Sequence, residues 1–177
     1  NYSFKSKYLA TATIRADGSS RYSKNNKWGY FPSAAIAWKF SEEEFFKNVP
    51  IISDGKLRVG YGETGSTSIS PYYTLDMLVS GKVCLADKLY TFFAPGTRLP
   101  ADLKWETTSQ FNVGLDLGIL NDRIRLTADY YIKNTRDLLN TVQLPRSLGY
   151  ATTIKNIGKI QNKGVEIQVD AALFEKA

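Results

Sequence analysis

The sequence predicts an all-β protein whose long strands run up and down and pair in an antiparallel sheet. Apolar and polar residues alternate over long stretches, these stretches exceed the length of ordinary strands, and the connections between them alternate between long and short. Side chains of a strand point to its two faces in turn, so strict alternation gives one apolar face and one polar face.

Residues 105–136 carry the clearest pattern and are predicted to form two strands joined by the two-residue turn Asn121-Asp122. The apolar face of the second strand consists of Ile124, Leu126, Ala128, Tyr130 and Ile132. Its polar face consists of Arg123, Arg125, Thr127, Asp129, Tyr131 and Lys133. Strands this long exceed the usual length of about five or six residues. They fit a tilted membrane-spanning strand of roughly 9–11 residues that extends into water at its ends.

Six strands are expected along the chain, at residues 7–17, 30–41, 55–63, the two strands of 105–136, and 163–174. One short helix is predicted after the second strand, because Ser41 can cap a first turn that contains the glutamates 42–44. This helix should end near Asn48, ahead of a proline.

The connections indicate how the sheet lies in a membrane. Residues 18–29 form a polar loop and residues 64–104 and 137–162 form long connections, whereas residues 41–54 form a short helical link and the Asn121-Asp122 turn is only two residues wide. Outer-membrane barrels combine long extracellular loops with short periplasmic turns, so the first group is predicted to lie outside and the second in the periplasm. Six strands are too few to close such a barrel, and an open sheet edge in lipid is costly. We therefore expect residues 1–177 to be a partial transmembrane β-barrel domain.

Composition narrows the function. Hydrophobic residues make up 43% of the chain and mean hydropathy is −0.28, with no apolar run long enough for a spanning helix. Histidine is absent and there is a single cysteine, Cys84, which removes the common catalytic bases and metal sites. We predict no enzymatic activity and no cofactor. The net charge of +6 comes from scattered lysines and arginines, so nucleic-acid binding is also disfavoured.

Four segments resemble one family in its own order: residues 17–46, residues 57–65 (LRVGYGETG), residues 103–139 and residues 149–169. The chain is similar to the C-terminal barrel portion of SusC/RagA-type TonB-dependent outer-membrane transporters. Residues 66–98 fit the family pattern least, as a variable extracellular loop would.

This resemblance implies a barrel of about 22 strands in the outer membrane of a Gram-negative bacterium, with an N-terminal plug that is not in this chain. It also implies import of glycan oligosaccharides or peptides, a SusD-like surface lipoprotein as a lid, and TonB as the source of energy. The expected partners are therefore that lipoprotein, TonB, outer-membrane lipid and the imported substrate.

Five aromatic residues are candidates for ligand contact, because aromatic faces stack on sugar rings: Trp28, Tyr30, Tyr72, Tyr73 and Trp105. The alternative is that these rings anchor loops or form a girdle at the lipid–water interface. For Trp105, at the end of a strand, we favour that alternative.

The inward-facing charged set comprises Arg58, Arg123, Arg125, Asp129, Lys133, Glu166 and Asp170. We expect most of these side chains to form cross-strand pairs rather than to contact substrate. Gly60 and Gly62 leave one face of their strand bare, which predicts a bend or the close approach of another backbone.

Two other functions compete with the importer. A soluble β-sandwich that binds carbohydrate would bury Leu115, Leu126 and Ile167 between two sheets, whereas a barrel leaves them facing lipid. A passive outer-membrane barrel without a plug would share the strands but not the dependence on TonB.

Overall fold

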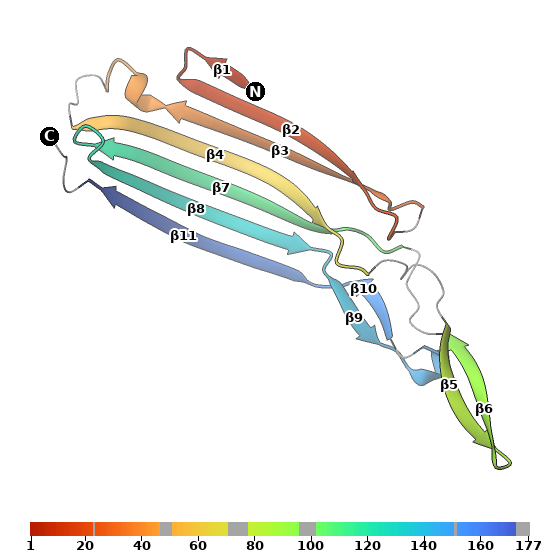
Figure 1. Cartoon of the computed structure of the whole chain (residues 1–177). Coiled ribbons are helices and arrows are strands. Elements are labelled where there is room, and N and C mark those ends of the chain that lie inside the picture. The colour runs from red at the N-terminus through yellow and green to blue at the C-terminus, as the bar shows by residue number, and fades with distance from the viewer. Residues whose placement is uncertain (23, 47–50, 71–77, 96–101, 151, 173–177) are drawn as a thin grey trace.

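The computed structural model describes residues 1–22, 24–46, 51–70, 78–95, 102–150 and 152–172. Seven strands form one antiparallel sheet in the order β1-β2-β3-β4-β7-β8-β11 (Figure 1). Their bounds are Tyr2–Phe4 (β1), Tyr8–Gly18 (β2), Trp28–Lys39 (β3), Ile52–Ser66 (β4), Glu106–Ile119 (β7), Ile124–Arg136 (β8) and Lys159–Ala171 (β11). Each strand pairs with the next sheet strand along the chain, which confirms the predicted up-and-down arrangement.

The six predicted strands are all present, and they are long. The shortest has 11 residues and the longest has 15. At about 3.3 Å per residue such strands measure roughly 40 Å, more than the apolar band of about 25 Å that barrels present to lipid. β1 is an additional strand, and its three residues pair with the start of β2. A strand so short shows no alternation, which is why the sequence pattern did not indicate it.

Two hairpins occupy the long connections. β5 (Leu78–Leu85) pairs with β6 (Lys88–Pro95), and β9 (Leu139–Gln143) pairs with β10 (Thr152–Asn156), with a 3-10 turn at Arg146–Leu148 between the latter two. Both hairpins lie beyond the same end of the sheet, opposite the β7–β8 connection (Figure 1). We call this the loop end, and the end with the β3–β4 and β7–β8 links the turn end. The β4–β7 and β8–β11 connections are long and the β7–β8 connection is short, as predicted, but the β2–β3 connection (residues 19–27) is no longer than the β3–β4 link (residues 40–51).

The β7–β8 connection is wider than expected. Ile119 pairs with Ile124, so four residues, 120–123, lie between the strands rather than two. Leu120, Asn121 and Asp122 all have positive φ, at 56°, 56° and 62°. Asn and Asp accept this left-handed conformation more readily than most residues, because their short side chains bond locally.

The predicted helix at Ser41 is wrong. The chain makes only a 3-10 turn at Phe40–Glu42, without a side-chain cap, and the Ser41 hydroxyl instead lies 3.3 Å from Asp54 Oδ1. The Phe40 ring lies over Gly55, where a Cβ would overlap it, and meets Trp38 edge-on at 5.9 Å. The link therefore turns directly onto the sheet; the expected end near Asn48 lies outside the described residues. No helix within the described part of the chain has the length and apolar character of a membrane span.

Glu43 ties this link to the ends of two strands. Its carboxylate accepts hydrogen bonds from Tyr8 Oη at 2.8 Å and Trp38 Nε1 at 3.4 Å, and pairs with Lys7 Nζ at 3.0 Å. The bond from Tyr8, followed by that from Lys7, lowers the pKa of Glu43 below its usual range.

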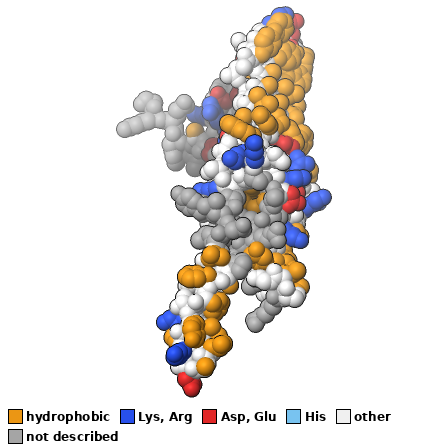
Figure 2. Space-filling view, turned by 90° about the vertical axis from the view of Figure 1, so that its right-hand side faces the viewer, with side chains coloured by type: hydrophobic (Ala, Val, Ile, Leu, Met, Phe, Trp, Pro, Cys, Tyr) orange, Lys and Arg blue, Asp and Glu red, His pale blue; other side chains and the backbone are white. Residues whose placement is uncertain are grey.

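The sheet has one continuous apolar face. Cross-strand pairs on this face join like with like, for example Leu57 with Leu115 and Leu117 with Leu126. No described segment covers the face, and Ile167 is 69% exposed. Figure 2 shows hydrophobic side chains gathered along one side of the sheet, with charged side chains beyond them toward the loop end. A sandwich would have buried these residues, so the sandwich alternative is wrong for the described chain.

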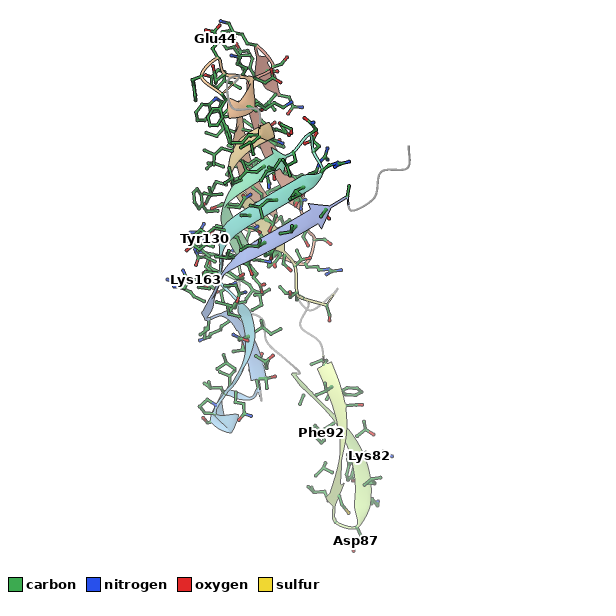
Figure 3. All side chains as sticks on the ribbon, turned by 90° about the vertical axis from the view of Figure 1, so that its left-hand side faces the viewer. Glu44, Lys82, Asp87, Phe92, Tyr130 and Lys163 are labelled. Carbon is green, nitrogen blue, oxygen red and sulfur yellow. The ribbon has the colours of Figure 1, made fainter. Side chains whose placement is uncertain are left out.

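A small core lies at the loop end instead. Tyr22, Ile69 and Leu103 are buried, and Trp105, Leu139 and Ile154 pack against them. These residues come from all three long connections and their flanks, so the cluster holds the three together. The hairpin of β5 and β6 extends away from this cluster, with Asp87 at its tip and Phe92 and Lys82 along its length (Figure 3).

Candidate functional site on the polar face of the sheet

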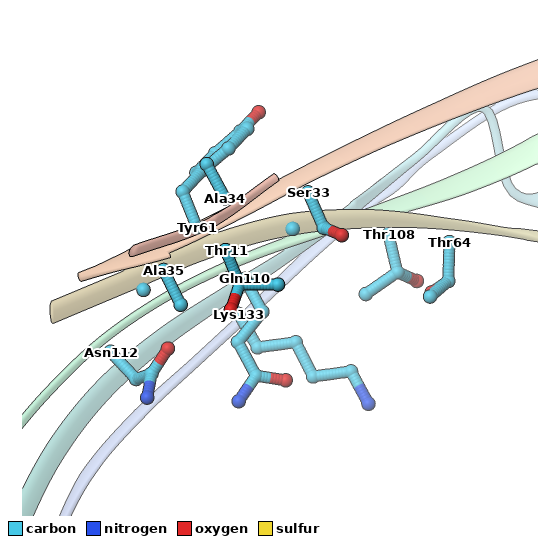
Figure 4. A pocket seen from close by; sticks show the side chains of 12 residues that line it. Thr11, Ser33, Ala34, Ala35, Tyr61, Thr64, Thr108, Gln110, Asn112 and Lys133 are labelled. Atoms are coloured by element: carbon cyan, nitrogen blue, oxygen red, sulfur yellow. The ribbon is translucent and has the colours of Figure 1, made fainter. Parts of the chain in front are cut away.

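Gly60 and Gly62 of β4 open a groove of 320 Å³ on the polar face. The neighbouring strands also carry small side chains there, Thr11 on β2 and Ser33 on β3. Any side chain at position 60 would bring its Cβ within 2.7 Å of Asn112 Oδ1. Because Gly60 has no side chain, the Asn112 amide of β7 can lie over the backbone of β4. Figure 4 shows Asn112 with Gln110 and Lys133 on one side of the sheet, and Tyr61 with Ala34 on the other.

A charged cluster lies next to this groove, nearer the turn end. Arg58 Nε donates to Asp116 Oδ2 at 2.8 Å, and Arg58 Nη2 bonds Asp129 Oδ1 at 3.1 Å. Thr127 Oγ1 adds a hydrogen bond to Asp116 at 3.3 Å. Gly114 lies beneath the cluster, where a Cβ would meet Arg58 Nη2 at 2.7 Å. One guanidinium thus joins β4, β7 and β8 through two carboxylates, in the forked geometry that favours Arg.

A second depression, of 690 Å³, lies toward the loop end on β7, β8 and β11. Its lining includes Gln110, Asn112, Tyr131, Lys133, Asn162 and Glu166. Gln110, Asn112 and Lys133 also line the groove beside Gly60, so the two hollows adjoin each other. The polar face therefore carries two neighbouring hollows.

The predicted inward charged set is only partly paired. Arg58 and Asp129 form the expected cross-strand ion pair. Arg125 pairs with Asp122 of the turn at 3.5 Å, and Arg123 lies in the turn rather than in a strand. Asp170 sits opposite Arg125 in the register of β8 and β11, and Glu166 sits opposite Asp129.

The aromatic candidates fall into different environments. Trp28 and Tyr30 lie at the loop end of β3 and are 64% and 65% exposed. Tyr30 pairs with Ala16 and so shares the apolar face. Trp105 stacks on Tyr22 with ring centroids 5.2 Å apart, and its Nε1 donates to the Asn26 carbonyl oxygen at 2.9 Å. Tyr72 and Tyr73 lie outside the described residues.

Burial of Tyr22 raises its pKa to about 12. Its hydroxyl donates to the Ser66 carbonyl oxygen at 3.4 Å, and its ring is 1% exposed. Sequence reasoning did not single out Tyr22, because nothing in a polar connection distinguishes a tyrosine that is buried from one that is not. Gly114 and Tyr131 were missed for a related reason, since their importance depends on what lies opposite them.

The chemistry of the face is that of binding. Within the described residues, no group of three or more His, Cys, Asp or Glu side chains is placed to hold a metal ion. Amide, hydroxyl and amino groups predominate in the larger depression and are mixed with small apolar residues in the groove beside Gly60, and such polar groups recognise a ligand by hydrogen bonds.

Comparison with known proteins gives a consistent result. The family model of the TonB-dependent receptor-like β-barrel matches residues 1–175. TonB-dependent receptor P3 of Formosa agariphila is 42% identical over 97% of this chain, and TonB-dependent receptor SusC of Bacteroides thetaiotaomicron is also 42% identical over 97%. The matched region is 17% of the first relative and 18% of the second, so the chain spans less than a fifth of either.

Solved structures of the RagAB peptide importer share the fold. The "open-open" state superposes with a TM-score of 0.85 at 28% identity, over 99% of this chain and 19% of that one. The "closed-closed" state gives a TM-score of 0.83 at 28% identity, over 98% and 19%. By name these relatives are TonB-dependent receptors and a peptide importer. With its long up-and-down strands, one apolar face and one polar face, this chain belongs to the TonB-dependent receptor-like β-barrel family.

Proposed function

We propose that residues 1–177 form part of the barrel wall of a TonB-dependent importer in the outer membrane of a Gram-negative bacterium. The observation that carries this proposal is the division of one long-stranded sheet into an uncovered apolar face and a hollowed polar face. In the complete barrel the apolar face meets lipid, and the polar face lines the lumen. The match to SusC and to the RagAB peptide importer supports oligosaccharides or peptides as the substrates.

The loop end would then face the outside of the cell and the turn end the periplasm. A SusD-like lipoprotein would cover the loop end, where the core around Tyr22 and Trp105 holds the long connections in one unit. The plug and the segment that contacts TonB would come from the remainder of the protein, which in the relatives is more than four fifths of the chain.

The aromatic candidates divide under this proposal. The exposure of Trp28 and Tyr30 beside the apolar face supports a place in the interfacial girdle, and the contacts of Trp105 support loop anchoring. Direct ligand contact is proposed for Tyr72 and Tyr73, which belong to the longest extracellular connection.

Uptake by intact cells tests the proposal. The full-length protein and its neighbouring lipoprotein would be produced in an outer-membrane host with and without TonB, and uptake of labelled oligosaccharides and peptides measured. We expect accumulation only when TonB is present. Equal uptake in the two hosts would instead establish a passive barrel.

A further inference from the structure

We propose that the depression on β7, β8 and β11 is a binding subsite for a sugar ring, centred on Tyr131. The inference rests on the proposed importer function and specifies the substrate class. The subsite lies in the half of β8 nearer the loop end, since this strand runs from Ile124 at the turn to Arg136. A substrate that enters from outside would therefore reach it before the Arg58 cluster.

The Tyr131 ring can lie against the sheet because the residue beside it on β11 is a glycine. Tyr131 pairs with Asn112 on β7 and with Gly164 on β11. A Cβ at Gly164 would come within 2.9 Å of Tyr131 Oη and 3.1 Å of its Cε1 and Cζ. Because Gly164 has no side chain, the ring can lie over the backbone of β11 and turn its other face to the depression. Such a ring face attracts the weakly positive C–H groups of a pyranose.

Unpaired polar groups surround this ring. Among the described residues, no hydrogen-bond or ion-pair partner is found for the side chains of Gln110, Asn112, Tyr131, Lys133, Asn162 and Glu166. The contrast with the neighbouring cluster is sharp, because there Arg58, Asp116 and Asp129 bind one another. Sugar hydroxyls both donate and accept hydrogen bonds, and amides supply both functions.

Backbone pairing favours a sugar over a peptide. The depression contains two lysines, Lys133 and Lys163, and one glutamate, together with Asp129, which Arg58 binds. Peptides bind to sheets mainly by adding a strand to a free edge. β7 and β8 are paired on both sides, so the strands that carry most of the subsite have no free edge.

The test measures binding to the intact full-length transporter in detergent by calorimetry. The probes are maltohexaose, cellohexaose and mannohexaose, with a tryptic digest of casein as the peptide probe. We expect at least one hexaose to bind, and Tyr131→Ala to weaken that binding about tenfold. Tyr131→Phe keeps the ring and should retain most of the affinity.

Tyr130→Ala is the matched control, since it removes the adjacent ring from the opposite, apolar face of the same strand (Figure 3). It should leave hexaose affinity unchanged. Heat-modifiable gel mobility would verify that each variant forms a barrel. If Tyr131→Ala does not assemble, Gln110→Ala and Asn162→Ala, at exposed side chains, should each weaken binding severalfold.

Three outcomes would overturn the inference. Binding of casein peptides alone would refute a sugar subsite while leaving the importer proposal intact. Hexaose binding that Tyr131→Ala, or both amide variants, leave unchanged would place the sugar elsewhere. Absence of binding by both probe classes would also reject the subsite. The importer function is tested separately, by the measurement of TonB-dependent uptake.

Discussion

The two ends of the sheet differ in the contacts that join their parts. Toward the turn end, ion pairs and charged hydrogen bonds join the strands and the β3–β4 link, as in the Arg58 cluster and around Glu43. At the loop end, a buried aromatic and aliphatic core joins the connections, and one ion pair links Arg136 of β8 to Glu63 of β4. Among the described residues, Gln110, Asn112 and Tyr131 of the adjacent depression have no side-chain partner. The difference teaches that the side chains that join the strands and connections are not the ones left free on the polar face.

Removing the central ring of the loop end should have the largest effect. Trp105→Ala would delete the contacts with Tyr22 and Phe31, whose ring centroids lie 5.2 Å and 5.8 Å away. We expect a local loss of about 3 kcal/mol, since large aromatic truncations cost this much. Limited proteolysis of the full-length protein should show faster cleavage in the long connections and an intact barrel. Unchanged cleavage would mean that other contacts hold the loops.

Breaking the charged cluster should destabilise the sheet itself. Arg58→Ala leaves Asp116 and Asp129 without their shared partner, at a cost of about 2 kcal/mol for partly buried charged hydrogen bonds. The midpoint of urea unfolding in lipid should fall. Arg58→Lys keeps the positive charge but not the forked guanidinium, so its unfolding midpoint should lie between those of the wild type and Arg58→Ala. A wild-type midpoint for Arg58→Ala would show that the cluster is dispensable.

Alkaline pH should weaken the loop end selectively. The folded pKa of Tyr22 is about 12, above its usual value of 10.0, because burial disfavours the tyrosinate. A group with a raised pKa contributes stability that is complete below pH 10.0 and lost as pH rises toward about 12. Protease resistance of the long connections should decline over that range. Tyr22→Phe should abolish this pH-dependent decline in protease resistance. If the decline persists in Tyr22→Phe, another titrating group is responsible for it.

Acid should produce the smaller, opposite effect at the turn end. Glu43 has a lowered pKa because Tyr8 and Lys7 bond its carboxylate. Its contribution is therefore present above the ordinary glutamate pKa of 4.5 and lost as pH falls through the folded value. Hydrogen exchange in the β3–β4 link should accelerate below pH 4.5. In Glu43→Gln, hydrogen exchange in this link should be faster already at neutral pH and should no longer depend on acid. Identical pH profiles of exchange in Glu43→Gln and the wild type would contradict the role given to Glu43.

The long strands were predictable because alternation fixes both the strand and its faces. The alternating apolar residues from Phe111 to Ile119 of β7 and from Ile124 to Ile132 of β8 lie on one face, as expected. The hairpin of β5 and β6 was not predictable in the same way, since apolar residues such as Leu78 and Val79 occur on both of its faces. Its turn residues, Ala86 and Asp87, have positive φ but are not a strong turn pair.

Site residues were harder to predict than the fold. Ser41 met the rule for a helix cap, yet Phe40 packing on Gly55 sets the course of the link. Tyr131 was one of many residues on the polar face in the sequence pattern. Only the register shows that Gly164 lies opposite it and gives its ring a place to lie.

The neighbour-to-neighbour order of the sheet has a consequence for biogenesis. Within the described residues, every strand of the main sheet pairs with the sheet strand that precedes or follows it, so no pairing needs a crossover connection. Pairing in chain order lets each strand find its register against a sheet strand that has already been added. Insertion can therefore proceed hairpin by hairpin, with each completed strand serving as the template for the next.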